Sequence, residues 1–285
     1  MPEVETVRRE LAPWLAGRTV LDARLTAAEA GPKYRSLDRL AGQDIVEVTR
    51  RGKFLVLPLE RAGERLDDLV IHLGMTGVIS ATPPARPQHL RVQLQLSPGG
   101  KAPVILGQPE PDAGSLYFTD IRRFGRFLVT PAGDYRELPT LHAMGPEPLG
   151  AGFTVDGFAA ALARSAVAIK TYLLSQKPVA GLGNIYVDEA LWRARLHPLL
   201  PSAEVPAERL PDLHRAIRDV LTESIEAEGT TLSDYRTVKG SSGAFGARLQ
   251  AYGRAGEACL RCGSTMERIV IGGRSTHYCP NCQVQ

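Results

Sequence analysis

CLRCGSTMERIVIGGRSTHYCPNC, residues Cys259–Cys282, contains all four cysteines of this 285-residue chain, as two Cys-x-x-Cys pairs with sixteen residues between them. Each pair can offer two thiolates to a metal ion, and the intervening residues suffice for a strand, a turn and a returning strand. Such a short segment buries too little apolar surface to fold alone, and zinc supplies roughly 10 kcal/mol or more in isolated fingers. The spacing therefore predicts a β-hairpin zinc finger with one structural Zn2+ held by Cys259, Cys262, Cys279 and Cys282.

Two disulfide bonds are the alternative use of these cysteines. Nothing near the N-terminus is typical of a signal peptide, and a reducing cytosol keeps thiols unpaired. Apolar runs such as Phe54–Leu59 are far shorter than the roughly 20 residues that cross a membrane. We therefore expect a cytoplasmic protein that binds a zinc ion, and we expect it to be a monomer. A hydrophobic content of 44% in 285 residues provides enough apolar side chains for two or three domains.

The zinc-finger end of the chain is basic. From Arg236 to Gln285, seven arginine and lysine residues stand against two glutamates, a net charge of +5, whereas the whole chain carries +3. The rest of the chain is therefore about −2 net. This concentration favours a surface that faces nucleic-acid phosphates. A solvated charged face, or a zinc ribbon that serves only as a structural clip, is the alternative.

The first 135 residues have the pattern of an antiparallel β-sandwich. In His89–Ser97, apolar residues alternate strictly with arginine and glutamine, as a half-buried strand requires. One helix with an apolar stripe, Thr6–Leu15, precedes the strands. Further short strands bounded by turn residues are predicted at Ile45–Val48, Lys53–Leu59, Leu69–Leu73, Ser115–Thr119 and Arg126–Thr130.

After Pro146–Pro148 the apolar period becomes helical. Helices are predicted at Val155–Arg164, Ile169–Ser175, Asn184–Arg195 and Pro211–Glu228, with the Asn184 side chain as a cap. The fold class is therefore a multidomain α+β protein. We expect a β-sandwich domain with a flanking helix at residues 1–135, a helical domain at 136–240 and the zinc-finger domain at 241–285.

Two segments have the composition of nucleic-acid contacts. Gly181–Tyr186 places two glycines and an asparagine at a helix start, where free N–H groups and the helix dipole attract phosphate. A tight turn between packed helices explains these glycines equally well. Asp120–Gly125 puts Phe124 among arginines, which suits a ring inserted into a base stack. The alternative is a β-bulge whose Phe124 faces the core.

Two other segments gain meaning only in combination. His72–Gly77 ends a strand with two glycines around Met75, a residue that is usually core filler. The chain begins Met1-Pro2-Glu3, and removal of Met1 would expose a secondary amine. An α-amine titrates near 8, so an appreciable fraction is unprotonated at neutral pH and can attack an aldehydic carbon. Glu3 would then be placed to move protons.

Together these segments resemble the formamidopyrimidine-DNA glycosylases, repair enzymes that excise oxidised purines. The resemblance runs from one end of the chain to the other. The shared segments are Val4–Arg9, Arg51–Lys53, His72–Gly77, Asp120–Gly125, Met144–Leu149, Gly181–Tyr186, Gly229–Leu232, Tyr252–Arg254 and Gly273–Pro280. It implies that the helical domain is a helix-two-turn-helix DNA-binding module and that the partner is double-stranded DNA with oxidised bases or abasic sites.

The resemblance also implies catalytic roles. Pro2 would attack C1′ of the damaged nucleoside, Glu3 would transfer protons, and successive β- and δ-elimination would cut the strand. Lys53 matches a lysine near the sugar and phosphate. Arg274, at the tip of the zinc hairpin, matches an arginine that grips the phosphates beside the flipped nucleotide.

Further residues match DNA contacts of the family. Met75, Arg122 and Phe124 correspond to the three residues that fill the space left by the flipped base. Segment Val238–Phe245 resembles the loop that closes over that base. Pro87 stands where many relatives have a DNA-contacting histidine, and His89 lies two residues on. The predicted DNA-binding residues are His72, Met75, His89, Arg122, Phe124, Lys170, Asn184 and Tyr186.

One departure concerns the N-terminus. Family members usually begin with two Pro-Glu pairs, whereas this chain has one and is three residues shorter before the same helix. Either Pro2-Glu3 is the catalytic pair on a shortened lead, or it is the pair at the helix start. Two other functions therefore stay open: a catalytically silent binder of damaged DNA, and an endonuclease VIII-like enzyme for oxidised pyrimidines. The Met75, Arg122 and Phe124 set argues against the latter.

Overall fold

The computed structural model describes residues 1–26, 31–104, 113–231 and 235–284. They form two compact units. The sandwich unit consists of Pro2–Glu137 and Glu228–Ala244, and the helical unit consists of Met1, Leu138–Ala227 and Phe245–Gln285. The segment Glu228–Ala244 thus returns to the N-terminal part of the chain, and the domain boundaries expected at 135 and 240 stay predictions.

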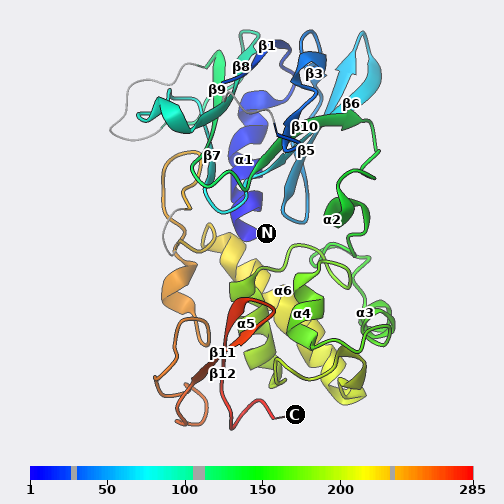
Figure 1. Cartoon of the computed structure of the whole chain (residues 1–285), viewed down its shortest axis with the longest axis vertical. Coiled ribbons are helices and arrows are strands. Elements are labelled where there is room, and N and C mark those ends of the chain that lie inside the picture. Colours follow the sequence, from blue (N-terminus) through cyan, green and yellow to red (C-terminus); the bar gives the residue numbers. More distant parts are fainter. Residues whose placement is uncertain (27–30, 105–112, 232–234, 285) are drawn as a thin grey trace. The chain divides into compact units, whose positions relative to one another are not determined.

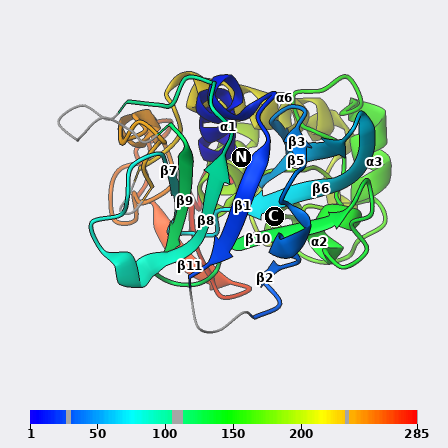
Figure 2. The ribbon, with the colours of Figure 1, turned by 90° about the horizontal axis from the view of Figure 1, so that it is seen from above.

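The sandwich unit contains two sheets, seen from above in Figure 2. The first sheet has the order β1-β8-β9-β7 and is antiparallel throughout. The second has the order β2-β10-β6-β5-β3, with β4 also on β5, and only its β2-β10 pair is parallel. The strands of the first sheet are β1 (Val20–Leu25), β7 (Gly77–Ser80), β8 (Leu90–Leu96) and β9 (Ser115–Asp120). Those of the second are β2 (Tyr34–Arg35), β3 (Asp44–Ile45), β4 (Thr49–Arg51), β5 (Phe54–Arg61), β6 (Glu64–His72) and β10 (Arg126–Pro131).

The predicted alternation in β8 is confirmed at its apolar positions. Val92, Leu94 and Leu96 are buried in a core to which both sheets contribute. Arg91 is an exception, because it too is buried and its guanidinium donates to the carbonyl of Asp120 (3.0 Å). A charge-assisted hydrogen bond of this kind makes a buried arginine tolerable.

Helix α1 (Pro2–Leu15) packs Val7, Leu11 and Trp14 into this core and lies at one edge of the sandwich, against β4 and β5 (Figures 1 and 2). It begins four residues before the predicted start at Thr6. Proline is favoured in the first turn of a helix, where its missing N–H is no loss, and the acidic Glu3 and Glu5 suit the positive end of the helix dipole. The apolar stripe marks only the buried face of the helix, so a prediction based on it does not include a polar first turn.

The predicted strand Ile45–Val48 is wrong in its extent. The structure has β3 ending at Ile45 and a separate β4 beginning at Thr49. Ile45 pairs with Leu59, so Val46 meets Pro58, whose carbonyl accepts from Val46 N–H (2.9 Å). Pro58 has no N–H that could donate back to the Val46 carbonyl, so the hydrogen-bond ladder between β3 and β5 is interrupted here.

The helical unit packs its helices around one apolar core that includes Phe158, Leu191 and Ile217. Its helices are α2 (Pro139–His142), α3 (Val155–Leu162), α4 (Ile169–Leu174), α5 (Asn184–Ala194) and α6 (Leu210–Glu226). Short 3-10 turns lie in both units, at Leu37–Arg39 and Pro87–His89 in the sandwich unit and at Ser202–Glu204, Ala207–Arg209 and Phe245–Arg248 in the helical unit. The cap of α5 is Gly183 and not Asn184, whose side chain donates to the carbonyl of Ser275 (2.8 Å).

The C-terminal hairpin has the predicted form. Strands β11 (Glu267–Ile271) and β12 (Arg274–Tyr278) are antiparallel, and Ile271 pairs with Arg274 across a two-residue turn. Gly272 and Gly273 in this turn have φ of 54° and 73°. Positive φ at both positions is the geometry of a type I′ hairpin turn and favours glycine. Among the described residues, no helix is long and apolar enough to cross a membrane.

Candidate nucleic-acid interface and zinc centre

Strand register gathers six of the predicted site residues at one end of the sandwich unit. In the second sheet His72 pairs with both Phe54 and Arg126, so Lys53 and the segment before Arg126 lie beside His72. In the first sheet Gly77 pairs with Asp120 and Leu90 with Thr119, which places Met75 and His89 near the end of β9. Loop 121–125 joins these two sheet ends. The predicted residues at this common end are Lys53, His72, Met75, His89, Arg122 and Phe124.

The buried carboxylate of Asp120 organises this end. It accepts hydrogen bonds from the Thr76 hydroxyl (2.6 Å) and from the N–H of Gly125 (2.6 Å). The Thr76 oxygen in turn accepts from the N–H of Arg122 (3.1 Å). A Cβ on Gly125 would lie 2.8 Å from the Phe118 ring and 2.9 Å from the Asp120 carboxylate. Loop 121–125 and the turn around Thr76 are therefore held together as one surface.

Met75 and Phe124 project from this surface. Their exposed fractions are 54% and 48%, so neither side chain belongs to the core. The Arg122 guanidinium lies 5.0 Å from the centroid of the Phe124 ring, within the range of a cation–π contact. The alternative in which Phe124 faces the core is therefore wrong, and the Phe124 ring is exposed on this surface.

His72 is held as a neutral ring. Its Nδ1 accepts from the N–H of Gly74 (3.2 Å), and its ring centroid lies 4.7 Å from that of Phe54. Burial, together with the nearby positive charges of Lys53 and Arg126, lowers the pKa of His72 to about 4. Gly74 has φ of +65°, and a Cβ there would lie 2.8 Å from backbone atoms of Phe124 and Gly125. Glycine is thus required where the His72 turn meets the Phe124 loop.

The low pKa of His72 predicts acid sensitivity. Because its folded pKa, about 4, is below the ordinary value of 6.5, the unfolded chain binds more protons between these values. The stability that neutral His72 provides is complete above pH 6.5 and is lost as pH falls toward 4. The free energy of unfolding should therefore fall less between pH 7 and 4.5 in His72→Gln than in the wild type, as urea titrations can show. His142→Gln, on the exposed end of α2, is the control, and parallel curves for wild type and His72→Gln would contradict the prediction.

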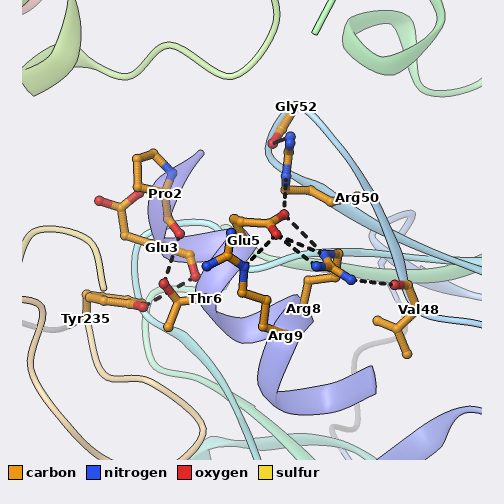
Figure 3. Close-up of polar contacts among 10 residues, drawn as sticks. All are labelled: Pro2, Glu3, Glu5, Thr6, Arg8, Arg9, Val48, Arg50, Gly52 and Tyr235. Atoms are coloured by element: carbon orange, nitrogen blue, oxygen red, sulfur yellow. Dashed lines mark hydrogen bonds and ion pairs between the residues drawn. The ribbon is translucent and has the colours of Figure 1, made fainter. Parts of the chain in front are cut away.

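The first turn of α1 contacts Thr230 and Tyr235 of the same unit, and Figure 3 shows the Tyr235 contact. The Glu3 carboxylate accepts from the N–H of Thr230 (3.3 Å), and the Glu3 carbonyl accepts from the Tyr235 hydroxyl (3.3 Å). The Thr6 hydroxyl donates to the carbonyl of Pro2 (3.2 Å). Pro2 is buried, and its nitrogen is in the peptide bond to Met1. A free secondary amine at this position therefore requires removal of Met1.

In the helical unit two side chains converge on the hairpin. The Lys170 ammonium and the Asn184 amide both donate to the carbonyl of Ser275, at 2.9 and 2.8 Å. Lys170 also forms an ion pair with Asp188 (2.5 Å), and both side chains are 0% exposed. Asp188 accepts in addition from the N–H of His277 (2.9 Å). These contacts fix β12 beside the exposed Arg274.

The structure places two predicted DNA-binding residues in the interior. Lys170 is enclosed as described, and the buried Tyr186 hydroxyl accepts from Ser224 (2.9 Å). In this structure Lys170 and Tyr186 form hydrogen bonds to neighbouring residues. Direct contact of either residue with DNA stays a prediction. Sequence reasoning missed Asp188 and Glu189, which bind the hairpin and the N–H groups of residues 250–252. The available signal was two adjacent acidic residues within an otherwise apolar stretch of α5.

The four cysteines fit a zinc ion. All are free, and their sulfur atoms lie within 4.8 Å of one another. Tetrahedral zinc with Zn–S bonds of about 2.3 Å separates sulfurs by about 3.8 Å, and Sγ of Cys262 and Cys279 are 3.5 Å apart. The alternative of two disulfide bonds is therefore wrong in this structure. When bound, the ion would hold the two cysteine pairs together and so support the hairpin that presents Arg274.

Family models match three parts of the chain. The formamidopyrimidine-DNA glycosylase N-terminal domain matches residues 1–127 and the formamidopyrimidine-DNA glycosylase H2TH domain matches residues 144–236. The zinc finger found in Fpg and isoleucyl-tRNA synthetase matches residues 256–284. The chain belongs to the formamidopyrimidine-DNA glycosylase (Fpg) family. It is thus a DNA glycosylase of a family that serves base excision repair of oxidised purines, and the fold class, the helix-two-turn-helix domain and the zinc finger are confirmed.

Individual Fpg proteins resemble the chain over its full length. The Fpg of Thermus thermophilus is 44% identical over 285 residues, covering 99% of this chain and 97% of the relative. That of Deinococcus radiodurans is 42% identical, with coverage of 99% and 96%. The crystal structure of the Thermus thermophilus protein has a TM-score of 0.86 at 44% identity, covering 99% of this chain and 98% of that one. A Lactococcus lactis Fpg mutant in complex with Fapy-dG containing DNA has a TM-score of 0.83 at 31% identity and covers 100% and 99%.

Proposed function

We propose that this Fpg protein removes 8-oxoguanine and formamidopyrimidines from duplex DNA and then cuts the strand as an abasic-site lyase. Its partner would be double-stranded DNA that contains an oxidised base or an abasic site, bound by a monomer. Two Lactococcus lactis Fpg structures were solved with Fapy-dG containing DNA and with abasic-site DNA, which supports this substrate class. The observation that carries the proposal is the common end of the sandwich unit, where Lys53, His72 and the exposed Phe124 lie together.

The proposed chemistry begins at Pro2. After Met1 is removed, the lone pair of the Pro2 nitrogen attacks C1′ of the damaged nucleoside, and the bond from C1′ to the base breaks. The base leaves with a proton, and opening of the sugar gives an iminium (Schiff base) between Pro2 and C1′. Glu3 would supply and take protons. Loss of a C2′ proton then expels the 3′ phosphate by β-elimination, and δ-elimination releases the 5′ phosphate.

The remaining residues would bind and orient the DNA. Met75, Arg122 and Phe124 would fill the space that the flipped nucleotide leaves, and the exposed ring and thioether suit contact with base faces. Lys53 would contact the sugar and phosphate, and Arg274 and Asn184 would contact the flanking phosphates from the helical unit. Zinc would act through the hairpin that carries Arg274.

A catalytically silent DNA binder is the second candidate. It is favoured by the place of Pro2, which is buried in the first turn of α1, and by the Glu3 carboxylate, which already accepts from Thr230 N–H (3.3 Å). Such a protein would bind lesion duplexes without forming an adduct. The exposed Met75 and Phe124 serve this candidate equally well.

Borohydride trapping separates the two candidates. Incubated with a duplex that contains 8-oxoguanine opposite cytosine, the wild-type protein should form a covalent adduct that peptide mapping assigns to Pro2. Pro13→Ala, which replaces a proline elsewhere in α1, should form the same adduct. Tight binding without an adduct or a nick would establish the silent binder. Preference for an oxidised pyrimidine over 8-oxoguanine would instead favour an endonuclease VIII-like enzyme.

A further inference from the structure

Glu5 lies in the first turns of α1 at the centre of three arginines (Figure 3). Its carboxylate accepts from Arg8 (2.9 Å), Arg9 (3.0 Å) and Arg50 (3.0 Å). Arg8 and Arg9 belong to the same helix, whereas Arg50 comes from β4 in the second sheet. The Glu5–Arg50 contact is therefore the one of the three that joins α1 to another element.

The Glu5–Arg50 pair is shielded from solvent. The side chains of Glu5 and Arg50 are each 12% exposed, whereas that of Arg9 is 59% exposed. Although burial opposes it, hydrogen bonds from Arg8 and Arg50 lower the pKa of Glu5 to about 2. Glu5 is consequently ionised at any pH at which the protein works. A shielded, charge-assisted pair has a better defined geometry than an exposed one, which solvent screens.

Arg50 makes a second contact that leads toward Lys53. Its Nη1 donates to the carbonyl of Gly52 (3.0 Å), inside the turn between β4 and β5. Gly52 has φ of 57°, so this turn has a conformation that only glycine adopts readily. Lys53 follows directly, and its own ammonium is close enough to His72 to affect that ring's pKa. One guanidinium thus bridges the α1 carboxylate and the turn that carries Lys53.

We propose that Glu5 and Arg50 are positioning residues that fix Lys53 relative to the Pro2 end of α1. This inference rests on the proposed function, in which Pro2 and Lys53 act on the same nucleotide. Glu5 is three residues after Pro2, less than one helical turn, so the pair links the two groups by a short and stiff path. Errors of about 1 Å between reacting groups can cost about 100-fold in rate, so such a link affects catalysis more than binding.

Lysine and arginine are not equivalent in this link. A lysine at position 50 would retain the charge near Glu5, but its single ammonium lacks the planar fork that reaches Gly52 at the same time. Arg50→Lys therefore removes the bridge and keeps the charge. Arg9→Lys is the matched control, because Arg9 contacts the same carboxylate from within α1.

The test measures single-turnover cleavage of the 8-oxoguanine duplex by full-length variants. Arg50→Lys should lower the rate about tenfold or more while the duplex Kd stays within about threefold, and Arg9→Lys should resemble the wild type. The double variant Arg50→Lys/Lys53→Ala should cleave as Lys53→Ala does, because a positioning role disappears with the residue that is positioned. If Arg50→Lys does not fold, Glu5→Gln can replace it in the same comparison, in which the loss of rate is measured with Lys53 present and with Lys53→Ala.

Two results would overturn the inference. One is wild-type activity in both Arg50→Lys and Glu5→Gln. The other is an equal loss of rate with and without Lys53, which would mean that the pair acts independently of it. If the wild-type protein neither nicks the duplex nor forms a borohydride-trapped adduct, the proposed function itself is wrong. Failure of the proposed function is therefore distinguishable from failure of the positioning role.

Discussion

Cys259→Ser should release the zinc ion and abolish binding of lesion duplexes. Cys259 is 3% exposed and packs with Trp192, Met266 and Cys279, so a loss of coordination there also disrupts the small core beneath the hairpin. Zinc contributes roughly 10 kcal/mol or more to folding in isolated fingers, which a segment this short cannot replace. Without a folded hairpin Arg274 loses its position, and we expect the duplex Kd to rise about 100-fold or more. Zinc content and fluorescence anisotropy with labelled DNA measure the two effects.

The two tryptophans provide an internal control for zinc loss. Trp192 belongs to the core beneath the hairpin, whereas Trp14 is enclosed in the sandwich unit. A chelator should therefore red-shift the emission of a Trp14→Phe protein and leave that of a Trp192→Phe protein nearly unchanged. Val270→Ser, on the exposed face of β11, controls for change in the hairpin as such. Unaltered duplex binding by zinc-free Cys259→Ser would show that the hairpin does not contribute to DNA affinity.

Local patterns predicted those parts of the fold whose causes are local. The Cys-x-x-Cys spacing predicted the hairpin, and the alternation in β8 predicted the buried face of that strand. The break between β3 and β4 was missed because its cause, Pro58, lies on the partner strand. The association of Glu228–Ala244 with the sandwich unit was missed for the same reason, since Glu10 in α1 accepts from the N–H of Val238 (2.6 Å), 228 residues away.

The site shows the same division between local and distant causes. The resemblance of the contiguous segment Gly273–Pro280 predicts the role of Arg274, and the structure places Arg274 beside a two-residue turn. Glu5 and Arg50 are 45 residues apart, and Asp188 and His277 are 89 apart, so no sequence period connects them. Lys170, in α4, is among the DNA-binding residues predicted from the sequence. Only the fold encloses it with Asp188, and this changes the expected effect of substitutions there.

Asp188→Asn should destabilise the helical unit by about 3–5 kcal/mol, because it leaves the Lys170 ammonium in the interior without its counter-charge. Both side chains are 0% exposed, so water cannot compensate. Urea unfolding of the full chain measures this loss. Asp219→Asn, on the exposed face of α6, is the matched control and should change stability by less than about 0.5 kcal/mol.

A double variant separates the stability of the pair from its effect on DNA binding. Lys170→Met/Asp188→Asn removes the unpaired charge, and replacement of both partners of a buried ion pair is often nearly neutral. The asparagine oxygen can still accept from the His277 N–H, whereas the Ser275 carbonyl loses Lys170 as a donor. Stability should therefore recover to within about 1–2 kcal/mol of the wild type, while lesion-duplex affinity stays reduced because β12 beside Arg274 is less firmly held. Recovery of both would mean that the pair only fills space, and wild-type stability of Asp188→Asn itself would show that Lys170 loses its proton when it is unpaired.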